Sequence, residues 1–143
     1  MINKSPSPAK LAFSDIKIGS EYSFNRTISN EDIANFAKLS GDFNPIHVDP
    51  HYKKTIYKQN IVHGMLASSL FSALVGMHCP GENCLYLSQE IKFIKPIYPD
   101  QIVKVRGTLI NKVDALKILD MKTEILVDGE VVIKGQARVK VLE

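Results

Sequence analysis

An acidic residue and a histidine lie five positions apart in residues 41–47, which read Gly-Asp-Phe-Asn-Pro-Ile-His. Asp42 and His47 are side chains that can exchange protons. The stretch before Pro45 disfavours regular structure, because a residue preceding proline is pushed out of the α region and Asp and Asn bond their own turn backbone. A carboxylate and an imidazole on such a turn could share one proton-transfer task. Alternatively, Asp42 and Asn44 only close the turn while His47 faces solvent, and this segment alone leaves both interpretations open.

A second segment, residues 61–65, opens the most apolar stretch of the chain with Ile-Val-His-Gly-Met. Residues 61–77 carry apolar side chains on every side and several small residues, which is typical of a helix enclosed by the rest of the protein. Without further context, Gly64 would be read as a close packing contact of this helix.

The elements before this helix are predicted from the alternation of apolar residues and from helix-capping residues. Residues 18–28 alternate as a strand, and Ser29 is a good N-cap for an amphipathic helix that Gly41 is suited to end. Residues 49–54 resemble one helical turn with Pro50 at its first position.

From residue 85 onward the apolar residues alternate with a period of two, over residues 85–93, 102–110, 116–127 and 131–142. Asp128 and Gly129 predict a type I′ hairpin between the last two runs, and residues 113–115 predict another turn. The second half therefore reads as an antiparallel meander. The sequence predicts an α+β fold in which a sheet of about five strands wraps the enclosed helix.

The bulk composition predicts one globular domain over residues 11–143, after a frayed tail over residues 1–10. The formal charge is +3, from 18 basic and 15 acidic residues without a basic block, which argues against nucleic acid as a partner. The first ten residues lack the apolar core of a signal peptide, and residues 61–77 fall short of the ~20 residues that a bilayer span needs. We therefore expect no membrane span and a cytoplasmic location.

The two cysteines and the remaining histidines give little indication of a functional site. Cys79 and Cys84 follow His78, but a zinc site normally needs three or four ligands in recognisable pairs, so we expect neither a metal site nor a disulfide. His51 and His78 are read as surface residues.

Two longer strings carry a family resemblance. Residues 36–49 read Phe-Ala-Lys-Leu-Ser-Gly-Asp-Phe-Asn-Pro-Ile-His-Val-Asp, and residues 61–66 read Ile-Val-His-Gly-Met-Leu. Together they resemble the signature of the MaoC-like hydratases, and more narrowly of the single-domain (R)-specific enoyl-CoA hydratases. The resemblance covers nearly the whole chain and implies the hot-dog fold, a bent antiparallel sheet around a central helix.

The resemblance also implies a reaction, the reversible addition of water to a trans-2-enoyl thioester of coenzyme A to give an (R)-3-hydroxyacyl thioester. Asp42 and His47 would hold the water and exchange the protons, with the formal base left open. Gly64 would donate its backbone N–H to the thioester oxygen, because the first N–H groups of a helix lack intrahelical partners and favour negative charge. Ser72 would bond near the catalytic carboxylate, and Asn44 would order the loop.

Other residues have weaker roles in this interpretation. His63 would be structural, and Lys53, Lys54 and Lys58 are either coenzyme A phosphate contacts or a solvated face. No cofactor is expected, since coenzyme A is part of the substrate, and the family implies a homodimer with the acyl groove between subunits.

Three alternatives remain open from sequence. A 3-hydroxyacyl-[acyl-carrier-protein] dehydratase would use the same chemistry on a different carrier. A hot-dog acyl-CoA thioesterase normally has its acid on the enclosed helix, and residues 61–77 contain neither Asp nor Glu. A non-catalytic acyl-binding module would be favoured by loss of Asp42 or His47, and both are present.

Overall fold

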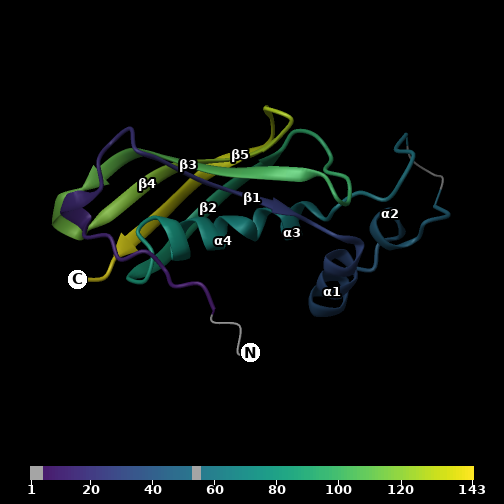
Figure 1. Cartoon of the computed structure of the whole chain (residues 1–143), viewed down its shortest axis with the longest axis horizontal. Helices are drawn as coiled ribbons and strands as arrows, with labels where there is room; N and C mark the ends of the chain where they lie inside the picture. The colour runs from purple at the N-terminus through teal and green to yellow at the C-terminus, as the bar shows by residue number, and fades with distance from the viewer. Residues whose placement is uncertain (1–4, 53–55) are drawn as a thin grey trace.

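The largest element of the protein is a five-stranded antiparallel sheet (Figure 1). The computed structural model describes residues 5–52 and 56–143. The strands are β1 (Glu21–Thr27), β2 (Cys84–Phe93), β3 (Ile102–Val113), β4 (Ile118–Val127) and β5 (Glu130–Val141). The helical segments α3 and α4 run along one face of this sheet, and α1 and α2 lie beyond one of its ends. These findings agree with the predicted α+β class.

The strand order is β1-β3-β4-β5-β2, so the predicted meander is correct only for β3, β4 and β5. The β4–β5 hairpin turns at Asp128 and Gly129, whose φ angles of 50° and 78° are those of the predicted type I′ turn. The prediction was wrong for β2, which pairs with β5 at the sheet edge rather than with β3. Alternation identifies a strand but not its partner, and residues 94–101, which contain Pro96 and Pro99, offer no tight hairpin that would force β2 beside β3.

The predicted central helix begins at Gly64 instead of near residue 61. It comprises α3 (Gly64–Ser68), α4 (Leu70–Ala73) and a π-helical turn over Leu74–His78. Residues 61 and 62 stay outside the helix because the Ile61 N–H donates to the Ile46 carbonyl at 3.2 Å and the Val62 N–H donates to the Ile97 carbonyl at 2.8 Å. None of the described helices is both long and apolar enough to cross a membrane.

One face of this helical run packs on the sheet. A Cβ atom at Gly107 of β3 would lie 2.8 Å from Leu74 Cδ2, so the close approach of helix to sheet depends on the missing side chain. The opposite face is open, because Met65 is 59% exposed and Ser69 and Ser72 are exposed as well. The prediction of a helix enclosed on all sides is therefore wrong for the single chain.

The helix α1 (Asn30–Ser40) begins and ends where the sequence predicts. Ser29 and Asp32 form a reciprocal capping box at its start, and Gly41 at its end has a φ of 80°, in the left-handed region that glycine adopts without strain. The one-turn helix predicted at residues 49–54 is a turn in its described part, residues 49–52, where the Tyr52 N–H donates to the Asp49 carbonyl at 3.1 Å, and residues 53 and 54 lie outside the described residues. A one-turn helix, α2 (Pro45–Val48), lies directly before this turn. Pro45 rather than Pro50 occupies its first turn, because the Asn44 side chain caps it by accepting the Ile46 N–H at 3.1 Å.

The N-terminal segment is held to the rest of the chain from Ala9 onward. The Ala9 N–H donates to the Met77 carbonyl at 2.9 Å, and the Ala9 carbonyl accepts the Glu82 N–H at 2.8 Å. Ala9 and Lys10, which pairs with Gly81, therefore do not belong to the frayed tail expected over residues 1–10. Two 3₁₀ turns, Phe13–Asp15 and Asp114–Leu116, complete the elements, and the second corresponds to the turn predicted at residues 113–115.

Candidate active site

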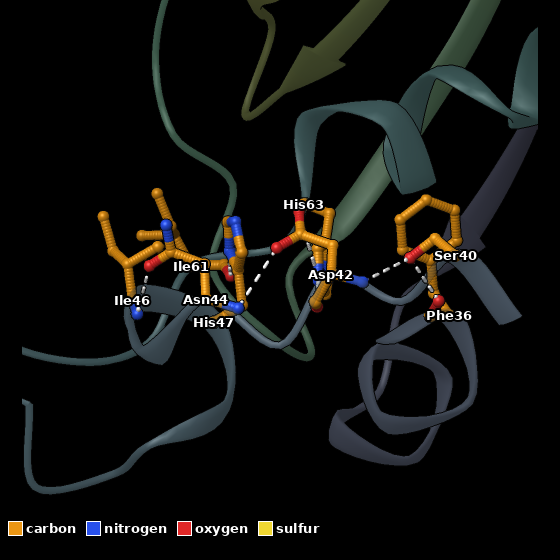
Figure 2. A network of polar contacts seen from close by, with 8 residues as sticks. All are labelled: Phe36, Ser40, Asp42, Asn44, Ile46, His47, Ile61 and His63. Atoms are coloured by element: carbon orange, nitrogen blue, oxygen red, sulfur yellow. Dashed lines mark hydrogen bonds and ion pairs between the residues drawn. The ribbon is translucent and has the colours of Figure 1, made fainter. Parts of the chain in front are cut away.

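The loop that follows α1 positions the carboxylate of Asp42 (Figure 2). The Asp42 N–H donates to Ser40 Oγ at 3.2 Å, and Asp42 Oδ1 accepts the Asn44 N–H at 3.1 Å. This turn fixes one carboxylate oxygen. The side chain is 49% exposed, so its second oxygen can reach a ligand or a water.

His47 lies on α2 rather than on an irregular loop, and its ring is anchored from the second segment. Its Nδ1 is 2.8 Å from the carbonyl oxygen of Ile61. A carbonyl can only accept, so Nδ1 carries the proton and the Nε2 of the neutral ring has a free lone pair. His47 thus presents a proton acceptor.

The surroundings of His47 favour this neutral form. Partial burial lowers the pKa of the imidazole, the Ile61 carbonyl partly opposes that shift, and repulsion from His63 lowers the pKa further. A pKa below the usual value keeps the ring uncharged, and therefore able to accept a proton, at neutral pH.

Asn60 ties the two segments together and was not singled out from the sequence. Its side-chain nitrogen lies 3.2, 3.1 and 2.9 Å from the carbonyl oxygens of Pro45, Ile46 and Asp49. These contacts hold α2 against the stretch leading to α3. The sequence does not predict that Asn60 joins the two segments, because the carbonyl groups that it binds lie about eleven to fifteen residues earlier in the chain.

His63 is buried between Asp42 and His47. Its Nε2 lies 3.0 Å from the Asp42 carbonyl oxygen and 4.0 Å from Asp42 Oδ2. Its ring stacks on that of His47, with centroids 4.0 Å apart and an interplanar angle of 28°. The sequence predicted a structural role for this residue and gave no reason to place it against both acid–base candidates.

Gly64 occupies the first position of α3, where its N–H has no partner within the helix. A Cβ atom here would lie 2.6 Å from Cε1 of Phe93, the last residue of β2. Glycine therefore keeps open the space between the helix start and the Phe93 ring.

A cavity of about 350 Å³ brings three of the predicted residues together. Asp42, His47 and Gly64 all line it, and most of its wall is apolar. A carboxylate oxygen of Asp42 and one ring nitrogen each of His47 and His63 lie within 4.8 Å of one another. One water molecule can bond two acceptors this close, because each hydrogen bond spans ~2.8 Å. The cavity can thus hold a water beside an apolar ligand, with a backbone donor at its edge.

The same three side chains do not make a convincing metal site. The ring nitrogen of His63 that lies 4.0 Å from the Asp42 carboxylate is Nε2, which carries the proton donated to the Asp42 carbonyl and cannot bind a metal ion there, so Asp42 and His47 supply the two remaining ligands. Zinc sites in proteins use at least three protein ligands. Elsewhere, burial raises the pKa of the free thiols Cys79 and Cys84 to about 11, so neither is a thiolate at neutral pH.

Other predicted residues lie outside this cavity. Ser72 is exposed and lines a different hollow beside Phe36, so within one chain it does not serve the Asp42 carboxylate. Lys58 is exposed, and Lys53 and Lys54 lie outside the described residues. His51 is exposed as predicted, whereas His78 is half-buried and stacks on Phe24, with centroids 4.9 Å apart.

Comparisons with known proteins show what the chain is similar to. The family described as MaoC-like domain matches residues 14–131. A relative from Rhodospirillum rubrum named (R)-specific enoyl-CoA hydratase is 40% identical over 130 residues, covering 90% of each chain. A mitochondrial 3-hydroxyacyl-[acyl-carrier-protein] dehydratase of Arabidopsis thaliana is 33% identical over 113 residues, 78% of this chain and 63% of that protein. The solved (R)-hydratase from A. caviae involved in PHA biosynthesis is 32% identical, with a TM-score of 0.85 over 89% of this chain and 98% of that one.

Proposed function

The chain belongs to the MaoC-like domain family, and we propose that it is a hydro-lyase that catalyses the reversible hydration of trans-2-enoyl-CoA to (R)-3-hydroxyacyl-CoA. The observation that carries this proposal is the convergence of Asp42, His47 and Gly64 on one cavity. Residues from separate segments thereby supply the two things that hydration needs, proton acceptors for water and a donor for developing negative charge.

In the proposed mechanism, a water molecule donates one O–H to the Asp42 carboxylate and the other to Nε2 of His47. Its oxygen attacks C3 of the enoyl group while one of its protons passes to the pair. The pair returns a proton to C2, so water is added across the double bond without any net change in the enzyme. Because water supplies both the hydroxyl group at C3 and the proton at C2, with no electrons gained or lost overall, the proposed reaction requires no cofactor.

Gly64 is the proposed donor to the thioester oxygen. Attack at C3 pushes electrons through C2 onto this oxygen, and the free N–H at the start of α3 favours that negative charge. The Phe93 ring lines the same cavity beside Gly64 and would lie against the bound acyl group.

Gly64→Ala is expected to lower kcat/KM by about tenfold or more, because the added methyl group displaces Phe93 or the thioester and a misplacement of ~1 Å can cost ~100-fold. Gly76→Ala is the matched control, since a Cβ atom at Gly76, in the same helical run, meets nothing within 4 Å. Steady-state kinetics and thermal melting of both variants check this expectation. Equal kinetics for the two variants would show that Gly64 is only a packing residue.

A spectrophotometric assay tests the function itself. With crotonyl-CoA or octenoyl-CoA, the enoyl absorbance is expected to fall without release of free thiol, and the product is expected to be oxidised by an (R)-specific and not an (S)-specific 3-hydroxyacyl-CoA dehydrogenase. Thiol release would instead identify a thioesterase, although residues 64–78 offer no Asp or Glu for that chemistry. No loss of enoyl absorbance with either substrate would refute hydration.

The acyl-carrier-protein dehydratase remains the second candidate, supported by the similarity to the Arabidopsis thaliana protein. The same assay distinguishes it when crotonyl-CoA is compared with the crotonyl thioester of an acyl carrier protein. We favour coenzyme A, because the relative with 40% identity acts on an enoyl-CoA by its name and covers more of this chain.

We extend the proposal to a homodimer in the cytoplasm. The edge strand β2 exposes Leu85 and Leu87, at 46% and 45%, and the exposed Met65 of the helical run lines a hollow together with Tyr86 and Ile91 of the same strand. A second copy that covers these surfaces would also remove an unpaired strand edge. The cytoplasmic location stays a prediction from the sequence.

A further inference from the structure

The side chain of His63 contacts both members of the proposed acid–base pair. It is 2% exposed, and Figure 2 shows it beside the loop that carries Asp42. Its Nε2 is 3.0 Å from the Asp42 carbonyl oxygen, and its ring stacks on His47 at 4.0 Å. Any shift of this ring would therefore move the Asp42 backbone or the plane of His47.

The position of the proton on His63 follows from its partners. The Asp42 carbonyl can only accept, so Nε2 carries the proton and donates it. The other nitrogen, Nδ1, is buried and has no hydrogen-bond partner among the described residues. It is therefore the unprotonated nitrogen of the neutral ring, because a proton there would have no acceptor. This tautomer is the opposite of that in His47, whose proton is on Nδ1.

His63 is also tied to the proposed oxyanion donor. It is the N-cap residue of α3, directly before Gly64, and its carbonyl accepts the Ala67 N–H at 3.1 Å in the first helical hydrogen bond. The Phe36 ring packs against its imidazole at an interplanar angle of 63°, with centroids 4.8 Å apart. Burial on that side and the stack on His47 leave the ring little freedom to rotate.

We propose that His63 is the positioning residue of this site, which fixes the carbonyl of Asp42, the ring plane of His47 and the start of the helix at Gly64 relative to one another. It does not itself exchange protons with the substrate, since His63 does not line the cavity. This inference rests on the proposed hydration, because the geometry that it maintains is that of the water-holding pair and the oxyanion donor.

Two substitutions separate the contacts of His63. His63→Phe keeps an aromatic ring against His47 but loses the donor to Asp42, and His63→Gln keeps an amide N–H near the position of Nε2 but loses the ring. Each is expected to lower kcat by about tenfold to a hundredfold, the scale of a small misplacement of catalytic groups, with KM changed less than about threefold.

The pH profile provides a readout that a purely structural role would not move. The titratable groups packed against His63, within the described part of the chain, are His47 and the Asp42 carboxylate. As the pH falls, repulsion between the two imidazoles opposes a proton on both rings at once and adds to the effect of burial in lowering the pKa of His47, so removal of the His63 imidazole is expected to raise that pKa. Activity needs unprotonated His47, and the acid limb of kcat/KM is therefore expected to move to higher pH in both variants.

His78→Phe is the matched control, because His78 also stacks on an aromatic ring, that of Phe24, and does not line the cavity. It is expected to keep the wild-type kcat and acid limb. Folded His63 variants with wild-type kcat, or with lower kcat and an unmoved acid limb, would overturn the proposal.

A measurement on the wild-type protein covers the case in which the variants do not fold, and it needs no substrate. Nitrogen-15 NMR of the imidazoles at neutral pH is expected to show the proton of His63 on Nε2 and that of His47 on Nδ1. A proton on Nδ1 of His63 would overturn the positioning role. A wild-type protein with these tautomers but no hydratase activity would instead refute the proposed function.

Discussion

Replacing Asp42 with asparagine is expected to lower kcat of enoyl-CoA hydration by about a hundredfold or more, which corresponds to ~2.7 kcal/mol of transition-state stabilisation. Asparagine keeps the size of the side chain and an oxygen that can accept the Asn44 N–H, as Asp42 Oδ1 does at 3.1 Å. It removes the negative charge and the ability to take a proton from water. The melting temperature should therefore stay within a few degrees of the wild-type value.

The chain offers a matched control for this substitution in Asp49. The carboxylate of Asp49 accepts the N–H two residues later, that of His51, at 2.9 Å, as Asp42 accepts that of Asn44. Asp49 does not line the cavity, so Asp49→Asn should retain wild-type kinetics. If Asp42→Asn is as active as Asp49→Asn, Asp42 only closes its turn, the alternative that the sequence left open.

Residues that act locally were predictable from sequence. The capping of α1 by Ser29, its end at Gly41 and the hairpin at Asp128 and Gly129 depend on contacts within a few residues. The convergence of Asp42 with Gly64 was predicted through the family resemblance, since no local rule relates a loop to a helix more than twenty residues away.

The remaining features depend on contacts that are distant in the chain. β2 pairs with β5 forty or more residues later, and period-two alternation is compatible with either edge of the sheet. The helix start at Gly64 is set by the carbonyl of Ile97, which binds the Val62 N–H. The role of His63 likewise depends on its stack with His47 and could not be read from the chain order.

The open face of the helical run was also missed because it depends on a contact that the chain order does not show. Its apolar and small residues predicted burial on all sides, whereas Met65 and Ser72 are exposed in the single chain. The apolar composition of a helix face predicts that the face is buried, but it does not identify the surface that buries it. The proposed second copy would account for this difference and would also decide whether Ser72 approaches an active site.

Replacing His47 is expected to be at least as damaging as replacing Asp42, with kcat lowered about a hundredfold or more. In His47→Asn the amide nitrogen takes the place of Nδ1 and can still donate to the Ile61 carbonyl, which preserves the anchor of the loop. In His47→Gln an amide takes the place of Nε2, which faces the water in the proposed mechanism. Neither amide accepts a proton, so both variants should lose activity, and the acid limb of kcat/KM that reports the lowered pKa of His47 should disappear with it.

The double variant Asp42→Asn/His47→Asn tests whether the two residues act on one water. If both hold the same molecule, removing either one already disables it, and the double variant should be less than about tenfold slower than the worse single variant. His51→Gln, an exposed histidine four residues along the chain, serves as the control and should keep wild-type kcat. Single-turnover hydration of crotonyl-CoA makes the comparison independent of product release. Losses that multiply in the double variant would mean that Asp42 and His47 act at separate steps, and the shared-water mechanism would have to be abandoned.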